Sequence, residues 1–201
     1  MSSTSAAAAL PISAKIRSRQ SRTRERILEV SAGLFVAKGF ENVSVEDIID
    51  AAEIARSSFY RFFSNRNDLL TEVIRPVFEK GIASLDAIVT PAPLATMNAV
   101  FDVYLELWRS GPNALKVSTR IGGKYFYLFE DLHAKYRSHL MALVEQVQSS
   151  GILLNDSADY SARLIARSAV PVMEVYCSDP DFEQLFHRSM RGFLLRAEAL
   201  Q

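Results

Sequence analysis

Hydrophobic residues recur with a helical period along nearly the whole chain after residue 22. One face of the first periodic segment carries Ile27, Leu28, Leu34 and Phe35. Gly39 follows this segment and can adopt the left-handed conformation that commonly ends a helix. The pattern predicts a first helix from about Thr23 to Lys38. Alternating β-branched runs bounded by tight turns are almost absent, so the sequence predicts an all-α fold of about nine helices.

Two short helical segments follow the first helix. Ser44, with Asp47 three residues later, is typical of a capping box that begins a helix. A second short segment covers residues 56–63, and two such helices joined by a turn of three or four residues have the dimensions of a helix-turn-helix. Ser64 is the expected N-cap of a long fourth helix, in which Pro76 predicts a kink.

The rest of the chain also alternates between helical patterns and breaks. Thr90–Pro93 is the clearest linker. The predicted helices beyond it cover about Leu94–Trp108, a segment to Arg120, Tyr125–Gln148, a helix from Asp156 or Ser157 to Tyr176 with a second kink at Pro171, and a last helix to about Leu200.

Charge is balanced over the chain and uneven along it. The 23 basic and 23 acidic residues cancel, which by itself argues against a basic nucleic-acid binder. Residues 1–26, however, hold six basic side chains against Glu25 alone, and such an arm suits an anionic partner such as a phosphate backbone, although a solvated tail would look the same. The order of charged and apolar residues does not fit a signal peptide, and we expect a cytoplasmic protein. The one cysteine, Cys177, is expected to be a small buried hydrophobe.

Residues 27–70 resemble the N-terminal DNA-binding domain of the TetR family of transcriptional regulators. The resemblance rests on residues at fixed spacing, namely Phe35 with Gly39-Phe40, Ser44-Val45 with Ile48, Phe59-Tyr60 with Phe63, and Arg66 with Leu69. It implies a flexible basic arm over residues 1–20, a three-helix DNA-binding domain with a helix-turn-helix over 21–66, and a helical ligand-binding and dimerisation domain over 67–201. The implied protein is a ligand-responsive repressor that binds a palindromic operator as a homodimer.

The third helix is the expected recognition helix. Phe59 and Phe63 face the core, so the outward side chains are free to meet base edges in the major groove. The expected DNA-contacting residues are Arg22, Arg24, Ser44, Arg56, Ser57, Ser58, Tyr60, Arg61 and Arg66. Arg56 suits guanine, whereas the resemblance implies phosphate contacts for Tyr60 and Arg66.

Two residues depart from the family pattern. Glu53 stands where the turn usually has glycine, and a non-glycine residue held left-handed costs on the order of 1–2 kcal/mol. The sequence therefore predicts a different backbone in this turn. Ala55 replaces the usual Ser or Thr, so the third helix should lack a side-chain cap.

The second domain is rich in aromatic residues, with eight between Phe101 and Tyr136. In the family this segment usually walls an inducer cavity, which implies an apolar or aromatic small-molecule ligand. The expected ligand-binding residues are Phe101, Tyr104, Trp108, Phe126, Phe129, His133 and Met173, with Arg109 and Glu174 as further polar candidates. Ordinary core packing would explain the same aromatic residues.

Hydrophobic stripes on the last two helices predict dimerisation through a four-helix interface. The expected interface residues are Leu164, Met173, Phe182, Phe186, Met190 and Phe193.

Two other functions compete with a regulator. The three histidines, His133, His139 and His187, form no metal-ligand pair one helical turn apart, and no nucleophile lies beside a base. We therefore expect no enzyme, no catalytic residue, no metal site and no cofactor. A nonspecific architectural DNA-binding protein would bind random and cognate duplexes equally, whereas a regulator prefers its site by roughly 10³ or more.

Overall fold

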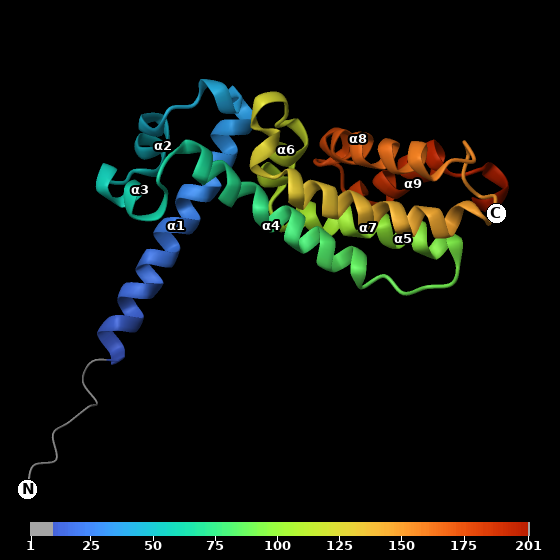
Figure 1. Ribbon diagram of the computed structural model, residues 1–201, viewed down its shortest axis with the longest axis horizontal. Helices are drawn as coiled ribbons and strands as arrows, with labels where there is room; N and C mark the ends of the chain where they lie inside the picture. The colour runs from blue at the N-terminus through green and yellow to red at the C-terminus, as the bar shows by residue number, and fades with distance from the viewer. Residues whose placement is uncertain (1–9, 201) are drawn as a thin grey trace, which may run out of the picture. The chain divides into compact units, whose positions relative to one another are not determined.

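The computed structural model describes residues 10–200, which form nine α-helices and three short 3-10 helices (Figure 1). The predicted all-α class is confirmed. In the described part of the chain the only β-type pairing is one isolated antiparallel bridge between Leu153 and Leu195. The chain divides into two compact units at Val73 and Ile74, inside one helix.

The first unit contains α1 (Leu10–Lys38), η1 (Phe40–Asn42), α2 (Val45–Ala52), α3 (Arg56–Phe62) and the first residues of α4 (Arg66–Asp86). Helix α2 packs against α1, and α3 packs against α2 (Figure 1). Its core is apolar and fully buried, and includes Ile27, Ile48, Phe59, Phe63 and Leu69. These contacts hold the two short helices, which are too short to be stable alone.

Helix α1 is longer than the sequence predicts, because it begins at Leu10 and not near Thr23. The added residues are mainly polar or small, so hydrophobic spacing carries little signal there. No glycine or proline follows Pro11 in this stretch, and proline is tolerated in the first helical turn. Part of the predicted arm is therefore helical, and residues 1–9 lie outside the described residues.

Two helix boundaries in the first unit are set by single residues, one at the end of α1 and one at the start of α4. Gly39 ends α1 with φ +78° and ψ 143°, a positive-φ conformation that glycine adopts readily but not the left-handed helical one that the sequence predicts. The cap of α4 is Asn65, and not Ser64 as predicted, because the Asn65 side-chain oxygen accepts hydrogen bonds from the backbone N–H groups of Asn67 (2.9 Å) and Asp68 (3.0 Å). Helix α4 continues through Pro76.

The second unit contains the remainder of α4 and five further helices, α5 (Pro93–Ser110), α6 (Pro112–Arg120), α7 (Glu130–Gln148), α8 (Ala158–Tyr176) and α9 (Phe182–Leu194), with η2 (Gly123–Leu128) and η3 (Ala197–Leu200). Helix α8 packs against α7 and α9, and α5 packs against the same two helices (Figure 1). Phe101, Ile165, Met173 and Phe186 are among the side chains fully buried between them.

Two predicted helix boundaries in this unit are wrong. Helix α7 begins at Glu130 and not near Tyr125, because residues 123–128 form a separate 3-10 helix and two acidic residues then occupy the favourable first turn of α7. Helix α9 ends at Leu194 and not near Leu200. Extended backbone follows, in which the Leu154 N–H donates to the Leu194 carbonyl over 2.8 Å.

The packing of α4 against α7 requires a residue without a side chain at position 81. A Cβ atom on Gly81 would lie 2.7 Å from Cε2 of Tyr136, well inside van der Waals contact. The glycine therefore lets the Tyr136 ring lie directly on the α4 backbone.

Cys177 is exposed, so the expectation that it is buried is wrong. It follows the last residue of α8, where the chain leaves the core. None of the helices within residues 10–200 combines the length and apolar character needed to cross a membrane.

Candidate nucleic-acid interface and ligand cavity

The capping box predicted at the start of α2 is present. The Ser44 hydroxyl accepts a hydrogen bond from the Asp47 backbone N–H (3.0 Å), and the Asp47 carboxylate accepts one from the Ser44 backbone N–H (2.8 Å). The hydrogen bonds from the Ser44 side chain and backbone, aided by Lys38, lower the pKa of Asp47 to about 2. The carboxylate is therefore ionised at neutral pH, and the first turn of α2 is fixed.

The turn between α2 and α3 keeps the left-handed backbone that a glycine would adopt. Glu53 has φ 53° and ψ 50°, so the predicted change of backbone is wrong. Its N–H donates to the Asp50 carbonyl (3.1 Å), and its carboxylate pairs with Arg26 at 2.7 Å. Ala55 provides no side-chain cap to α3, as expected. The helix-turn-helix geometry is retained at the cost of one strained residue.

Helix α3 presents a polar face to solvent. Phe59 and Phe63 are buried, as predicted. The opposite face exposes Arg56, Ser57, Tyr60 and Arg61, and Ser58 is half-buried at its edge. The buried face of α3 packs within the first unit, so the opposite, polar face can enter a groove of DNA.

The Arg56 side chain is 64% exposed and forms an ion pair with Glu46 at 2.7 Å. Its guanidinium also lies 5.7 Å from the centre of the Tyr60 ring. An exposed ion pair is worth no more than about 1 kcal/mol, so Arg56 can leave Glu46 for a stronger acceptor at little cost.

Two further predicted DNA-contacting residues, Arg66 and Arg24, also have partners inside the first unit. Arg66 donates through Nη1 to the carbonyls of Val43 and Glu41, the latter at 3.2 Å, and its guanidinium lies 4.5 Å from the centre of the Phe40 ring. Arg24 pairs with Glu72 and lies 5.7 Å from the ring of Phe63. Both guanidinium groups thus tie α1 or η1 to α4.

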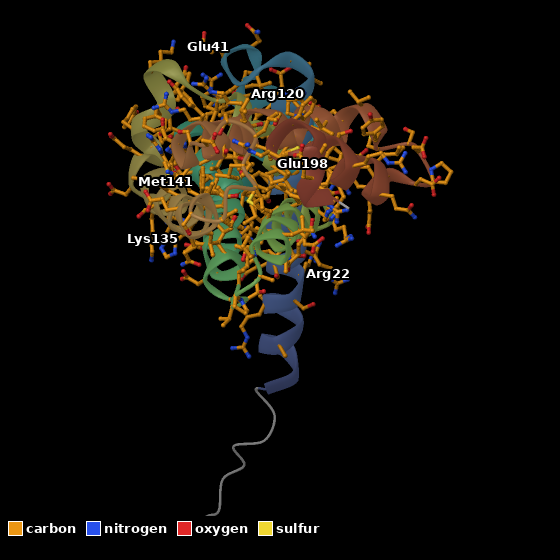
Figure 2. All side chains as sticks on the ribbon, turned by 90° about the vertical axis from the view of Figure 1, so that its right-hand side faces the viewer. Arg22, Glu41, Arg120, Lys135, Met141 and Glu198 are labelled. Atoms are coloured by element: carbon orange, nitrogen blue, oxygen red, sulfur yellow. The ribbon has the colours of Figure 1, made fainter. Side chains whose placement is uncertain are left out.

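Arg22 and Lys38 are more accessible basic residues of α1. Arg22, labelled in Figure 2, is exposed and bonds to Ser18 one turn earlier at 3.2 Å. Lys38 is exposed beside the capping box, 3.3 Å from Asp47. Sequence reasoning left Lys38 out of the site, although its place immediately before Gly39 puts it near Ser44.

A cavity of about 570 Å³ lies within the second unit. Four of the predicted ligand-binding residues line it, namely Tyr104, Phe126, Phe129 and His133. Three others lie elsewhere in this unit. Phe101 meets Phe186 edge to face, Trp108 packs on Phe182, and Met173 is fully buried in the core.

The polar lining of the cavity differs from the prediction. Glu174 is part of the wall, whereas Arg109 pairs with Glu183 outside it. Four arginines line the cavity that sequence reasoning did not select: Arg120, Arg137, Arg163 and Arg167. They come from three helices, and only Arg163 and Arg167, one turn apart on α8, are connected by local spacing in the sequence.

Burial keeps the other titratable groups of the wall neutral. Desolvation, with a smaller contribution from Arg137, lowers the pKa of His133, so its imidazole is uncharged at neutral pH. Burial raises the pKa of Tyr104 to about 12 and that of Tyr136 well above its usual value. The Tyr136 hydroxyl makes no well-formed hydrogen bond, although the phenol of Tyr104 lies beside it.

The predicted interface residues of α8 and α9 fall into two groups. Met173, Phe186 and Met190 are fully buried in the core of their own chain and do not face outward. Leu164 and Phe193 are 42% and 51% exposed, and Phe182 is half-buried against Trp108. Two exposed residues of α8 were not predicted, Tyr160 and Val175.

Comparison with known proteins places these features in a family. Residues 27–73 match a family model described as bacterial regulatory proteins, tetR family. The HTH-type transcriptional regulator TcmR of Streptomyces glaucescens is 32% identical over 93 residues, 45% of this chain and 40% of its own length. The HTH-type transcriptional repressor KstR2 of Rhodococcus jostii is 24% identical over 146 residues, 69% of this chain and 72% of its own. The chain thus spans less than half of the TcmR sequence.

Solved structures share the fold over a larger part of the chain. The ketosteroid transcriptional regulator KstR2 of Mycobacterium tuberculosis superposes with a TM-score of 0.70 at 20% identity, covering 86% of this chain and 95% of that one. The regulator PfmR of Thermus thermophilus gives 0.66 at 17% identity, with 84% and 97% covered. The family match thus shows a TetR-family regulatory domain over residues 27–73, and the solved structures show that most of the chain shares the fold of such regulators.

Proposed function

We propose that the protein is a transcriptional repressor that binds a palindromic DNA operator as a homodimer and is released by a small molecule. The observation that carries the proposal is the exposed polar face of α3, with Arg56, Ser57, Tyr60 and Arg61 opposite the buried Phe59 and Phe63. The family match over residues 27–73 and the likeness to regulators such as TcmR favour a regulatory protein over an enzyme.

The geometry of α3 suits the major groove. A helix about 10–12 Å across enters a groove roughly 12 Å wide, where its outward side chains reach base edges. Arg56 is long enough to donate two hydrogen bonds to guanine, and Ser57 is short enough to allow close approach. Arg22 and Lys38 add positive charge from α1, and Tyr60 and Arg61 are available to phosphates.

A homodimer is supported by the outer surface of α8 and α9. Tyr160, Leu164 and Val175 on α8 and Phe193 on α9 expose apolar side chains, and the two helices pack side by side in one chain. Two such helix pairs form a four-helix interface around a twofold axis. In the dimer two copies of α3 would lie about 34–36 Å apart, one turn of DNA.

Release by a ligand is supported by the course of α4. This helix contributes Val77 and Phe78 to the cavity wall, and its first turns, Arg66 to Val73, belong to the DNA-binding unit. A ligand that binds one position of α4 better than another would shift the populations of the two positions and so the spacing of the recognition helices.

Selection of bound duplexes from a random DNA pool, read by sequencing, tests the proposal. We expect a palindrome with half-sites one helical turn apart, bound at least about 10³-fold more tightly than a random duplex. Equal binding to random and selected duplexes would instead indicate an architectural protein.

Two arginine variants, one in each unit, test whether Arg56 reads the operator sequence. Arg56→Ala should change the selected bases within each half-site. Arg109→Ala is the matched control, because Arg109 is also half-exposed and paired with a glutamate but lies in the second unit. If Arg56→Ala and Arg109→Ala select the same sequence with the same affinity as the unchanged protein, Arg56 does not read the operator.

A further inference from the structure

We propose that the cavity of the second unit binds an amphipathic organic anion, a molecule with a hydrophobic ring-bearing body and one carboxylate. The effect of such a ligand on DNA rests on the function proposed above, but its binding does not. The proposal follows from the separation of apolar and cationic residues around the cavity.

One part of the cavity wall is aromatic and mostly buried. Phe78 and Phe129 stack with ring centres 5.9 Å apart, and Phe126 meets Phe129 edge to face at 5.3 Å. Tyr104 and Tyr136 add two buried rings, and Leu107, Leu115, Leu140 and Val170 complete the apolar lining. Flat hydrophobic groups gain most from such a surface, and a volume of about 570 Å³ is typical of pockets for drug-sized molecules.

The other part of the wall is cationic. Arg120 comes from the end of α6, Arg137 from α7, and Arg163 and Arg167 from α8. Glu174 is the one acidic residue in the lining. Arg120, labelled in Figure 2 together with the lining residue Met141, is about half-exposed, as are Arg137 and Arg163. The guanidinium groups therefore remain hydrated and mark the end of the cavity nearest to solvent.

The acidic partners of these arginines neutralise only part of this charge. Glu174 pairs with both Arg120 and Lys116, the latter at 3.5 Å. Asp159 accepts from Arg163 at 2.7 Å and lies 3.6 Å from Arg137. Arg167 forms no ion pair with any residue that the structure describes. An anionic group of a ligand could therefore pair with the cationic side chains that these acids leave unneutralised.

The uncharged state of the inner wall fixes the orientation of the ligand. Burial lowers the pKa of His133 and keeps the ring neutral, and the raised pKa values of both tyrosines keep them protonated far above neutral pH. The His133 ring that meets Phe78 and Phe126 is thus uncharged, and a buried carboxylate without a partner is costly. The body of the ligand therefore lies against the rings, and its carboxylate meets the arginines.

A set of pyrene derivatives tests the proposal on the free protein. The probes are 1-pyrenebutyrate, 1-pyrenebutanol and 1-pyrenebutylamine, which share one fluorescent body and carry charges of −1, 0 and +1. In fluorescence titrations at low salt we expect the acid to bind at least about tenfold more tightly than the alcohol, because a charge-assisted hydrogen bond is about twice as strong as a neutral one. The amine should bind most weakly. A purely apolar cavity would give the opposite order for the acid and the alcohol.

Variants locate the carboxylate. Arg167→Gln should weaken binding of the acid about tenfold and leave the alcohol unchanged, and Arg109→Gln, outside the cavity, should change neither. Equal binding of the acid and the alcohol, or an acid preference that Arg167→Gln and Arg163→Gln both leave intact, would overturn the proposal. The phosphate monoester of the alcohol is a further probe. If it binds about tenfold more tightly than the acid, the head group is a phosphate and the carboxylate assignment is wrong.

The two proposals fail in different ways. If 1-pyrenebutyrate binds with the expected preference but the selected operator is not released, the ligand class stands and release by this class of ligand fails. If a neutral hydrophobic compound releases the operator while the acid does not bind, the regulatory function stands and the anionic ligand is refuted.

Discussion

The Arg66 side chain donates hydrogen bonds to backbone carbonyls that would be bonded within a longer regular helix. Its guanidinium donates to two carbonyls in the segment between α1 and α2 and covers the ring of Phe40 at 4.5 Å. Carbonyl groups at the end of a short 3-10 helix have no partners within that helix. A residue at the start of α4 therefore holds the chain that leads into the helix-turn-helix.

The substitution Arg66→Ala should destabilise the protein. Loss of the hydrogen bonds to the two carbonyls and of the ring contact is expected to lower the free energy of unfolding by about 1–3 kcal/mol. Denaturant unfolding of the full chain, followed by circular dichroism, measures this change.

Arg61→Ala is the control for this prediction. Arg61 is exposed on α3, and a surface substitution of this kind usually changes stability by less than about 0.5 kcal/mol. If Arg66→Ala unfolds like the unchanged protein but binds every duplex more weakly, Arg66 contacts phosphate, as the resemblance implies. Its hydrogen bonds to the two carbonyls would then contribute nothing to stability.

At the scale of elements, the sequence predicts those helix boundaries that neighbouring residues determine. The Ser44 and Asp47 pair marks the start of α2 because both partners of the capping box lie within one turn. The pattern fails at the turn between α2 and α3. Glu53 keeps a left-handed conformation, and its carboxylate pairs with Arg26 on another helix, which the spacing of residues near the turn cannot show.

Helix α3 begins without a side-chain cap, which makes its N-terminus a place where stability can be added. Ala55 has φ −71° and ψ 146°, the backbone conformation of a good N-cap residue. Ala55→Ser should raise the free energy of unfolding by roughly 1 kcal/mol, because the new hydroxyl can accept a hydrogen bond from an N–H of the first turn. Thermal unfolding would show a higher Tm.

The control for the cap is Ala51→Ser. Ala51 is exposed inside α2, where serine has a lower helix propensity than alanine and no free N–H to accept from, so a loss of a few tenths of a kcal/mol is expected. Equal Tm values for the two variants would show that the first turn of α3 gains nothing from a cap.

At the scale of the whole molecule, the cavity depends on contacts that sequence spacing does not encode. Four of its aromatic and histidine residues were predictable, because one aromatic-rich segment supplies most of them. The arginines were not, because α6, α7 and α8 each bring one or two of them to the same place from positions far apart in the chain. The apolar stripe of α9 was likewise visible in the sequence, but half of it serves the core of its own chain and not a partner.

The surface of α8 and α9 leads to a prediction about assembly. Leu164 and Phe193 are the two predicted interface residues that expose a large part of their side chains. In a dimer built on these helices both would be buried, and a carboxylate placed there would be desolvated without a partner. Leu164→Asp and Phe193→Asp should therefore each weaken self-association at least about tenfold while leaving each chain folded.

Sedimentation equilibrium and operator binding measure this effect together. Because a palindromic site needs two recognition helices held one turn of DNA apart, both variants should bind the full operator more weakly and an isolated half-site as before. Leu154→Asp is the control, since Leu154 is 53% exposed but lies outside α8 and α9. If Leu164→Asp and Phe193→Asp associate like Leu154→Asp and the unchanged protein, the dimer uses another surface, and the spacing of the half-sites must be set by other helices.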